Sequence, residues 1–160
     1  MMKIAHATPQ DVIEIQRLLR ETWNDTYGGY FFQATLDEVY KNWQSIEFLT
    51  RQIEDFEIYF PIVKETESMI GVATARLSED VIVLFRLYVY PQHQRKGIGE
   101  LLINNVIRHF PKAKKIQLHV DLKNEKGQAF YKKQGFKEMK RESEKVANEV
   151  IDQILMVKEL

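Results

Sequence analysis

One segment of the sequence, residues 83–99, limits the possible folds more than any other. It begins with an apolar run rich in β-branched and aromatic residues, crosses a loop with two basic residues, and continues at Gly97 into apolar residues at helical spacing. A second run, with strand-like alternation, follows at residues 115–121. A strand, a helix and a strand in this order predict two parallel strands joined by a crossover helix.

The remaining sequence predicts further strands and helices around that pair. Residues 23–32 are aromatic and contain a Gly-Gly pair, so we expect a loop or a bent helix end there. The other predicted elements are a strand at 2–7, helices that begin near Thr8, Thr35 and Ser45, strands at 57–64, 69–77 and 81–90, a helix at 97–110, a strand at 115–121, a helix at 124–134, and strands at 136–143 and 149–158. We expect an α/β fold with one domain over residues 1–160, built on a mixed, mainly antiparallel sheet of about seven strands flanked by helices.

Charge and composition exclude several classes of function. The chain has 23 Lys and Arg residues against 23 Asp and Glu residues, so net charge gives no reason to expect nucleic acid or an anionic membrane as a partner. The absence of cysteine excludes disulfides, thiolate metal sites and a cysteine nucleophile. His6, His93 and His109 are scattered, and we expect no metal. No run is apolar enough for a signal peptide or a membrane span, so we expect a soluble cytoplasmic protein.

The loop before Gly97 has the features of a phosphate-binding turn. Gly97 and Gly99 permit a tight turn and a close approach to a ligand, and the first N–H groups of the following helix are free to bind an anion. Arg95 and Lys96 add positive charge. The Walker pattern and the third glycine of the dinucleotide fingerprint are missing, which leaves a pyrophosphate bound without metal, as in coenzyme A. The alternative is that the two glycines only shape a turn.

Two motifs in the second half of the chain resemble the GNAT superfamily of N-acetyltransferases. The first is Gln94-x-x-Gly97-x-Gly99 after a strand that ends Leu87-Tyr88-Val89, and it is similar to the acetyl-CoA signature of that family. The second runs from Leu118 to Phe136, with an asparagine at 124, a tyrosine at 131 and a Gly-Phe ending. The resemblance implies the fold of the family, in which the parallel strands splay apart and the pantetheine arm of acetyl-CoA inserts between them.

The resemblance also implies which residues bind the coenzyme. Backbone groups of Leu87 and Val89, on either side of Tyr88, pair with the pantetheine arm like an added strand. Asn124 contacts the arm, and Tyr131 lies near the sulfur. The pyrophosphate is held by backbone N–H groups in the segment that follows Gln94, namely those of Arg95, Lys96, Gly97, Ile98, Gly99 and Glu100.

The expected reaction is direct attack of a primary amine on the thioester, which needs a proton donor and a proton acceptor. Tyr131 is the expected catalytic acid, because a phenol can donate to the leaving thiolate. Many relatives place a glutamate near the position of Val83, so a base carried over from the family is in doubt. His119 is the catalytic alternative, with a histidine satisfied within the sheet as the structural reading. Glu21 and Asp25 are further candidates.

The acceptor amine is suggested by a second, narrower resemblance. Residues 21–27 are similar to the corresponding stretch of PaiA-type polyamine acetyltransferases, which implies spermidine or spermine as the acceptor. Glu21 and Asp25 would attract the cation, and Tyr27 and Tyr30 would stack on it. The alternatives are a protein N-terminal or lysine acetyltransferase and a non-catalytic coenzyme A sensor. The final strand, 150–157, is apolar enough to pair with a second copy in a homodimer, or else it closes the sheet of its own chain.

Overall fold

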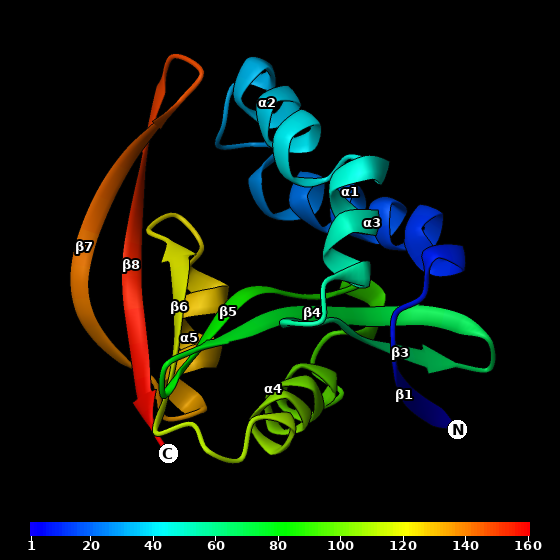
Figure 1. Ribbon diagram of the computed structural model, residues 1–160. Helices are drawn as coiled ribbons and strands as arrows, with labels where there is room; N and C mark the ends of the chain where they lie inside the picture. Colours follow the sequence, from blue (N-terminus) through cyan, green and yellow to red (C-terminus); the bar gives the residue numbers. More distant parts are fainter.

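The computed structural model describes residues 1–160 and contains an eight-stranded sheet with helices on both faces (Figure 1). The strand order is β1-β3-β4-β5-β6-β8-β7, and the short β2 pairs with β4. Only β5 and β6 are parallel, as the strand–helix–strand pattern predicts. The strands are β1 (Met2–His6), β2 (Ile58–Tyr59), β3 (Pro61–Glu65), β4 (Ser68–Ser78), β5 (Val81–Val89), β6 (Lys115–Asp121), β7 (Lys137–Val146) and β8 (Glu149–Glu159).

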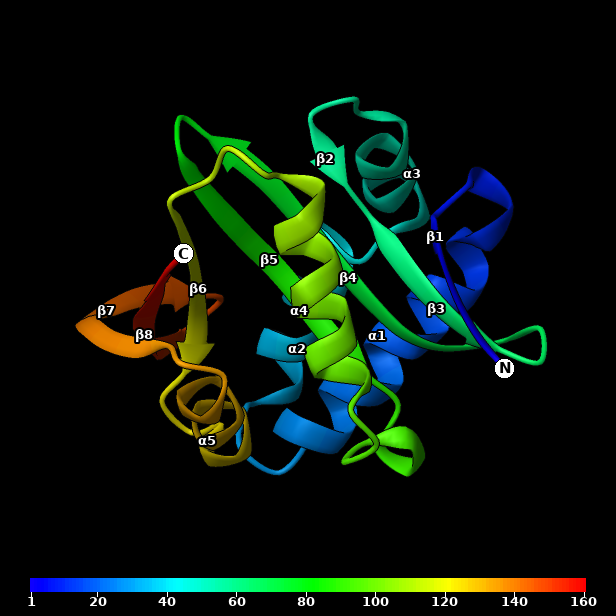
Figure 2. The ribbon, with the colours of Figure 1, turned by 90° about the horizontal axis from the view of Figure 1, so that it is seen from below.

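Three helices lie on one face of the sheet and two on the other (Figures 1 and 2). The first group is α1 (Val12–Tyr27), α2 (Gln33–Trp43) and α3 (Ile46–Glu54), and the second is α4 (Ile98–His109) and α5 (Glu125–Lys133). Thr8 caps the entry to α1 through the 3-10 turn Pro9–Asp11, because its backbone N–H donates to Asp11 Oδ2 at 2.9 Å. None of these helices is long and apolar enough to cross a bilayer.

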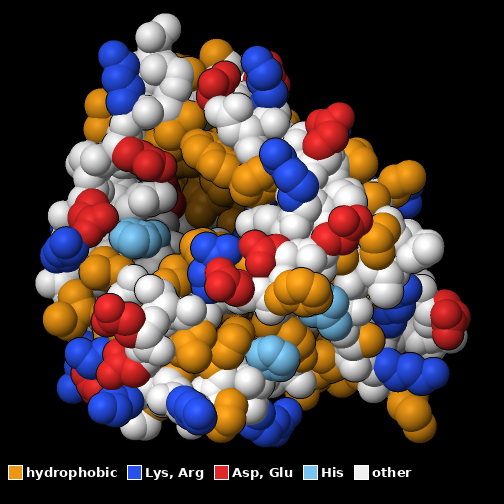
Figure 3. All heavy atoms as spheres, in the orientation of Figure 1, with side chains coloured by type: hydrophobic (Ala, Val, Ile, Leu, Met, Phe, Trp, Pro, Cys, Tyr) orange, Lys and Arg blue, Asp and Glu red, His pale blue; other side chains and the backbone are white.

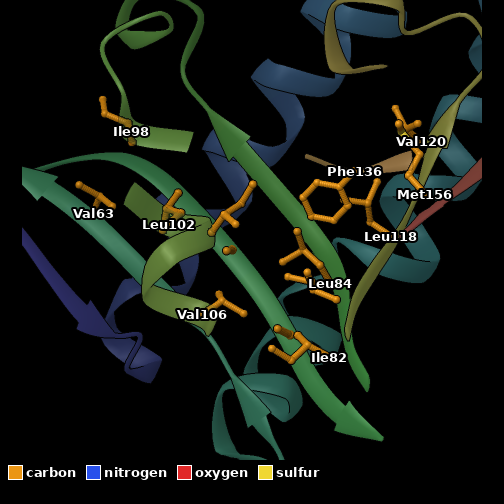
Figure 4. Close-up of a cluster of buried hydrophobic side chains, with 14 of the residues drawn as sticks. Val63, Ile82, Leu84, Ile98, Leu102, Val106, Leu118, Val120, Phe136 and Met156 are labelled. Carbon is orange, nitrogen blue, oxygen red and sulfur yellow. The ribbon is translucent and has the colours of Figure 1, made fainter. Parts of the chain in front are cut away.

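The larger part of the core lies between the sheet and α4 (Figure 4). Ile98, Leu102 and Val106 follow one another at helical spacing on α4 and are almost fully buried. They pack in one cluster with Ile82 and Leu84 of β5, and the same cluster reaches across β6 and β8. A second cluster joins α1 and α3 to the opposite face of the sheet. The sheet is therefore packed against helices on both of its faces.

The parallel pair separates after three residues. Val81, Ile82 and Val83 pair with Lys115, Ile116 and Gln117, and no further residue of β5 has a partner in β6. This divergence is visible in Figure 1. It leaves one backbone edge of β5 from Leu84 to Val89 free of any strand, so the predicted splay is confirmed.

A β-bulge lies on β5 at the start of the splay. Thr74 pairs with Arg86 while Ala75 pairs with Leu84, which leaves Phe85 as the extra residue. Arg86 then points away from α4 and donates from Nη2 to the Trp43 carbonyl at 2.6 Å and from Nη1 to Gln52. Burial lowers the pKa of Arg86 to about 10. These bonds tie the second and third helices to the splayed strand.

Several sequence-based expectations differ from the structure. Of the loop or bent helix end expected at residues 23–32, the first five residues continue helix α1, because the rings of Trp23 and Tyr27 pack one turn apart at 4.6 Å. The strand expected at 57–64 is divided at Phe60 into β2 and β3, which accounts for the eighth strand. The final strand lies between β6 and β7 and closes the sheet of its own chain. The edge beside it is β7, which is rich in charged residues.

Candidate active site

The loop between β5 and α4 presents unpaired backbone N–H groups to solvent. Gly97 is the N-cap of α4 and has a φ of +81°, a conformation that a side chain disfavours. A Cβ at this position would meet no atom within 4 Å, so the space above the loop is open. The first α-helical bond joins Leu101 N–H to Gly97 O, which leaves the preceding three N–H groups without intrahelical partners. The helix dipole favours an anion at this end.

The two glycines of the loop have different physical roles. A Cβ at Gly99 would lie 2.9 Å from Cζ of Phe130, so a glycine is needed where α4 and α5 approach each other. Gly97 instead supplies the left-handed turn. Gln94 folds the loop back onto β5, because its Nε2 donates to Val89 O at 3.1 Å. We expected both glycines to serve the approach of a ligand, and the structure shows that only Gly97 faces open space.

The strand expected to meet the coenzyme has a different environment on each of its faces. Leu87 and Val89 pack against the core beneath α4, and Tyr88 points to the face covered by α1. The Tyr88 hydroxyl accepts a hydrogen bond from Trp23 Nε1 at 3.0 Å. Burial raises the pKa of Tyr88. The side chains fix the strand, while its backbone edge toward β6 stays free for an added strand-like ligand.

Tyr131 lies on α5 with a hydroxyl that makes no hydrogen bond to the protein. Its ring contacts those of Phe130 and Phe136, at centroid distances of 5.2 and 5.5 Å. Burial raises the pKa of Tyr131, so the phenol stays protonated over the physiological range. A protonated, unpartnered phenol can donate a proton to a nearby ligand.

A hydrogen bond between Tyr27 and Asn124 links the C-terminal end of α1 to the N-terminus of α5. Asn124 caps α5 because its Oδ1 accepts from Gly127 N–H at 2.9 Å, and its Nδ2 donates to the Tyr27 hydroxyl at 3.4 Å. Tyr27 is only 5% exposed and stacks on Phe31. The structure therefore places Tyr27 in the interior, whereas we expected it on the wall of an amine pocket.

The remaining predicted acceptor residues are not brought together. Glu21, on the exposed surface of α1, lines a hollow of about 580 Å³ with Arg17, Arg20 and Tyr40. Asp25 is exposed at the end of α1, and Tyr30 is 56% exposed in the connection to α2. Glu21 therefore does not share its hollow with Asp25 or Tyr30.

His119 lies on the face of β6 opposite the core under α4. Ile116, Leu118 and Val120 face that core, so the alternation turns His119 to the other side of the sheet. Its Nε2 lies 3.1 Å from Oε2 of Glu142 on β7. Val83, where a glutamate is expected, is half-buried at the last paired residue before the splay.

Two acidic residues of this face were missed by the sequence analysis. Asp121 follows His119 by two positions on β6, so strand alternation alone indicates a shared face. Burial raises the pKa of the Asp121 carboxyl, whose Oδ1 accepts from Lys123 N–H at 2.7 Å. Glu142 comes from a distant strand, and no local pattern points to it. Figure 3 shows that this side of the molecule is hollowed, with hydrophobic side chains at the base.

The free N–H groups at the start of α4 and the open backbone edge of β5 form the arrangement that the GNAT resemblance implies for acetyl-CoA. The model of the acetyltransferase (GNAT) family matches residues 13–136, and the chain belongs to that family. It is therefore an acetyltransferase that uses acetyl-CoA.

Individual proteins agree with this assignment. The spermidine N(1)-acetyltransferase of Thermoplasma acidophilum is 25% identical over 142 residues, which are 85% of this chain and 88% of that protein. The crystal structure of the PaiA N-acetyltransferase from the same organism, in complex with coenzyme A, has a TM-score of 0.87 at 23% identity and covers 100% of this chain and 99% of its own. The crystal structure of the ribosomal-protein-S18-alanine N-acetyltransferase of Escherichia coli has a TM-score of 0.75 at 18% identity. The match covers 99% of this chain and 94% of that protein's chain. The two structural likenesses support the fold.

Proposed function

We propose that the protein transfers the acetyl group of acetyl-CoA to a primary amine of a small polyamine such as spermidine or spermine, with residues 1–160 as one catalytic domain. The observation that carries this proposal is the similarity to a spermidine N(1)-acetyltransferase along 85% of the chain. The acidic side chains beside the hollow agree with a cationic acceptor, since Asp121 and Glu142 lie on the same face of the sheet.

The coenzyme would be held mainly by the backbone. The pyrophosphate would bind the N–H groups from Arg95 to Glu100, where the open space above Gly97 leaves room for it. The pantetheine arm would pair with the free edge of Leu87 and Val89, next to Asn124. The site has the donors and the open edge that such a ligand requires.

The proton balance of the reaction assigns two further roles. The amine nitrogen bonds to the thioester carbonyl carbon, and the carbon–sulfur bond then breaks. Of the three protons on the ammonium group, one stays in the amide, one passes to His119 and then to solvent, and one is lost to solvent before the attack. Tyr131 donates its hydroxyl proton to the leaving thiolate and regains one from solvent. Presenting a neutral amine with a pKa near 10.4 at pH 7 costs about 4–5 kcal/mol.

The acceptor would occupy the hollow between the helices α1–α2 and the strands β6–β8–β7. In this proposal Asp25 and Tyr30, both exposed on the helical side, contact the distal cationic end of a polyamine. Glu21 contributes to the attraction of the cation from a distance, since it lies on the outer surface of α1. Tyr27 acts indirectly, through its hydrogen bond with Asn124.

A panel of acceptors tests the proposal. Release of free thiol from acetyl-CoA would be measured with spermidine, spermine, diamines, a lysine peptide, a peptide with a free N-terminus and a control without amine. The proposal predicts the highest kcat/KM with a polyamine. A higher kcat/KM for either peptide would contradict the polyamine assignment while leaving the acetyltransferase activity in place.

A further inference from the structure

We propose that Glu142 is a positioning residue for the reaction, and that its carboxylate holds the His119 ring so that Nδ1 is free to accept the proton of the amine. This inference rests on the proposed function, because it assumes that an amine is acetylated in this cleft. Glu142 comes from the C-terminal hairpin, so the hairpin completes a site whose other parts lie on β5, β6 and α5.

The sheet register brings the two side chains together. His119 of β6 pairs with Leu155 of β8, and Glu142 of β7 pairs with Gln153 of the same strand. The two residues therefore flank β8 diagonally on one face. Their contact is 3.1 Å, between His119 Nε2 and Glu142 Oε2, and each side chain is a little over one-third exposed.

A second contact holds the carboxylate itself. Lys140 Nζ lies 2.9 Å from Glu142 Oε1, so each carboxylate oxygen has its own partner. Lys140 stands two residues before Glu142 on β7. The two contacts restrict the orientation of the carboxylate, and in this proposal the carboxylate in turn orients the His119 ring.

The hydrogen bond also selects the tautomer of the ring. A carboxylate accepts, so His119 Nε2 carries a proton and Nδ1 presents a lone pair. When Nδ1 takes a proton from the amine, the resulting imidazolium faces the negative charge of Glu142. The other charged groups near His119 on this face are Lys140 on β7 and Asp121 on β6, while β8 presents only Gln153 and Leu155.

Strand β5 has no carboxylate or histidine that could accept a proton from the amine, so the His119–Glu142 pair matters for the reaction. Many relatives have a glutamate near position 83 of β5, at the start of the splay. This chain has Val83 there, and valine has no group that accepts a proton. His119 follows Gln117, the β6 partner of Val83, by two residues on the same face. The His119–Glu142 pair therefore supplies a proton acceptor from the opposite side of the opening.

The competing explanation is an ordinary surface ion pair. Pairs with this exposure contribute little to stability, so Glu142→Ala should fold normally and its effect on catalysis can be measured directly. Glu144→Ala is the matched control, because Glu144 is exposed two residues further along β7 and makes no hydrogen bond or ion pair. Glu142→Asp tests whether a shorter carboxylate restores part of the activity.

The decisive experiment is a double-mutant cycle with spermidine as acceptor. We expect Glu142→Ala to lower kcat about 10- to 100-fold, while its KM for acetyl-CoA stays within about twofold of the wild-type value. Glu142→Asp should recover part of the lost kcat, and Glu144→Ala should have the wild-type kcat. In a His119→Ala background, Glu142→Ala should cause no further loss, because it acts through the ring. Equal losses in both backgrounds, or wild-type kcat in Glu142→Ala, would overturn the inference.

Two outcomes separate this inference from the proposed function. An enzyme that acetylates spermidine at full rate without Glu142 rejects the inference alone. A protein that releases no thiol with any amine rejects the proposed function, and the inference with it. Nitrogen NMR of the ring gives an independent readout: we expect the Nε2–H tautomer of His119 in the wild type and a mixture in Glu142→Ala.

Discussion

Replacement of Tyr131 by phenylalanine removes the proposed proton donor and keeps the ring that packs against Phe130 and Phe136. The hydroxyl has no hydrogen-bond partner in the protein, so its loss leaves no buried group unsatisfied. We therefore expect the free energy of unfolding to change by less than about 0.5 kcal/mol. Loss of a general acid lowers the rate of the chemical step by about 10²- to 10⁴-fold, so kcat with spermidine should fall in that range.

The pH dependence gives the same prediction a second test. Burial raises the pKa of Tyr131 above its ordinary value of 10, so the wild-type phenol remains a donor throughout the neutral range. Ionisation of Tyr131 therefore should not limit kcat below about pH 10, and an alkaline loss below that pH must come from another group.

The assay is the initial rate of thiol release at saturating acetyl-CoA. Tyr40→Phe is the control, because Tyr40 lies on α2 and lines a separate hollow with Arg17 and Arg20 of α1. Wild-type kcat in Tyr131→Phe would refute the assignment of Tyr131 as the acid. A loss of kcat accompanied by a large fall in Tm would show instead that the hydroxyl stabilises the fold.

Three further predictions concern stability and coenzyme binding. Gly99→Ala should destabilise the protein by about 1–3 kcal/mol and weaken acetyl-CoA binding, because the added Cβ would lie 2.9 Å from Phe130. Gly97→Ala should cost about 1–2 kcal/mol through backbone strain alone. Calorimetric binding and urea unfolding compare the two variants, and equal stability of Gly99→Ala and the wild type would contradict the packing argument. Leu102→Ala, at a fully buried position on α4, should lower the free energy of unfolding measured in urea by about 2–5 kcal/mol. A loss below about 1 kcal/mol would mean that the core can close the cavity. The hydrogen bond from Thr35 lowers the pKa of Glu149 in the folded protein, so the ionised carboxylate stabilises the fold above about pH 4.5. This stabilisation is lost as the pH falls through the pKa that Glu149 has in the folded state. The Tm difference between the wild type and Thr35→Val should therefore shrink from about pH 7 to about pH 3, and a constant difference would contradict this prediction.

The coenzyme half of the molecule could be predicted from sequence because its signals are local. Gly97 begins a helix, and residues 83–89 and 115–121 have the pattern of strands, so the parallel pair follows from neighbouring segments. The splay follows only from the family resemblance, since no local pattern says where two parallel strands stop pairing.

The acceptor side could not be predicted in the same way, because it depends on contacts between distant segments. An aromatic side chain such as Tyr27 could equally line a pocket or lie in the interior. Its burial depends on contacts with Phe31 and with Asn124, and Asn124 is almost a hundred residues away in the sequence. The contact between His119 and Glu142 depends on the register of two strand pairs through β8, which strand periodicity does not specify.

The central claim is that the protein acetylates a polyamine with acetyl-CoA, and spermidine-dependent thiol release tests it most directly when the product is identified by mass spectrometry. The account predicts thiol release that depends on spermidine, with one acetyl group on the product for each thiol released. No spermidine-dependent release and no acetylated spermidine, from a protein that is folded and binds acetyl-CoA, would contradict it.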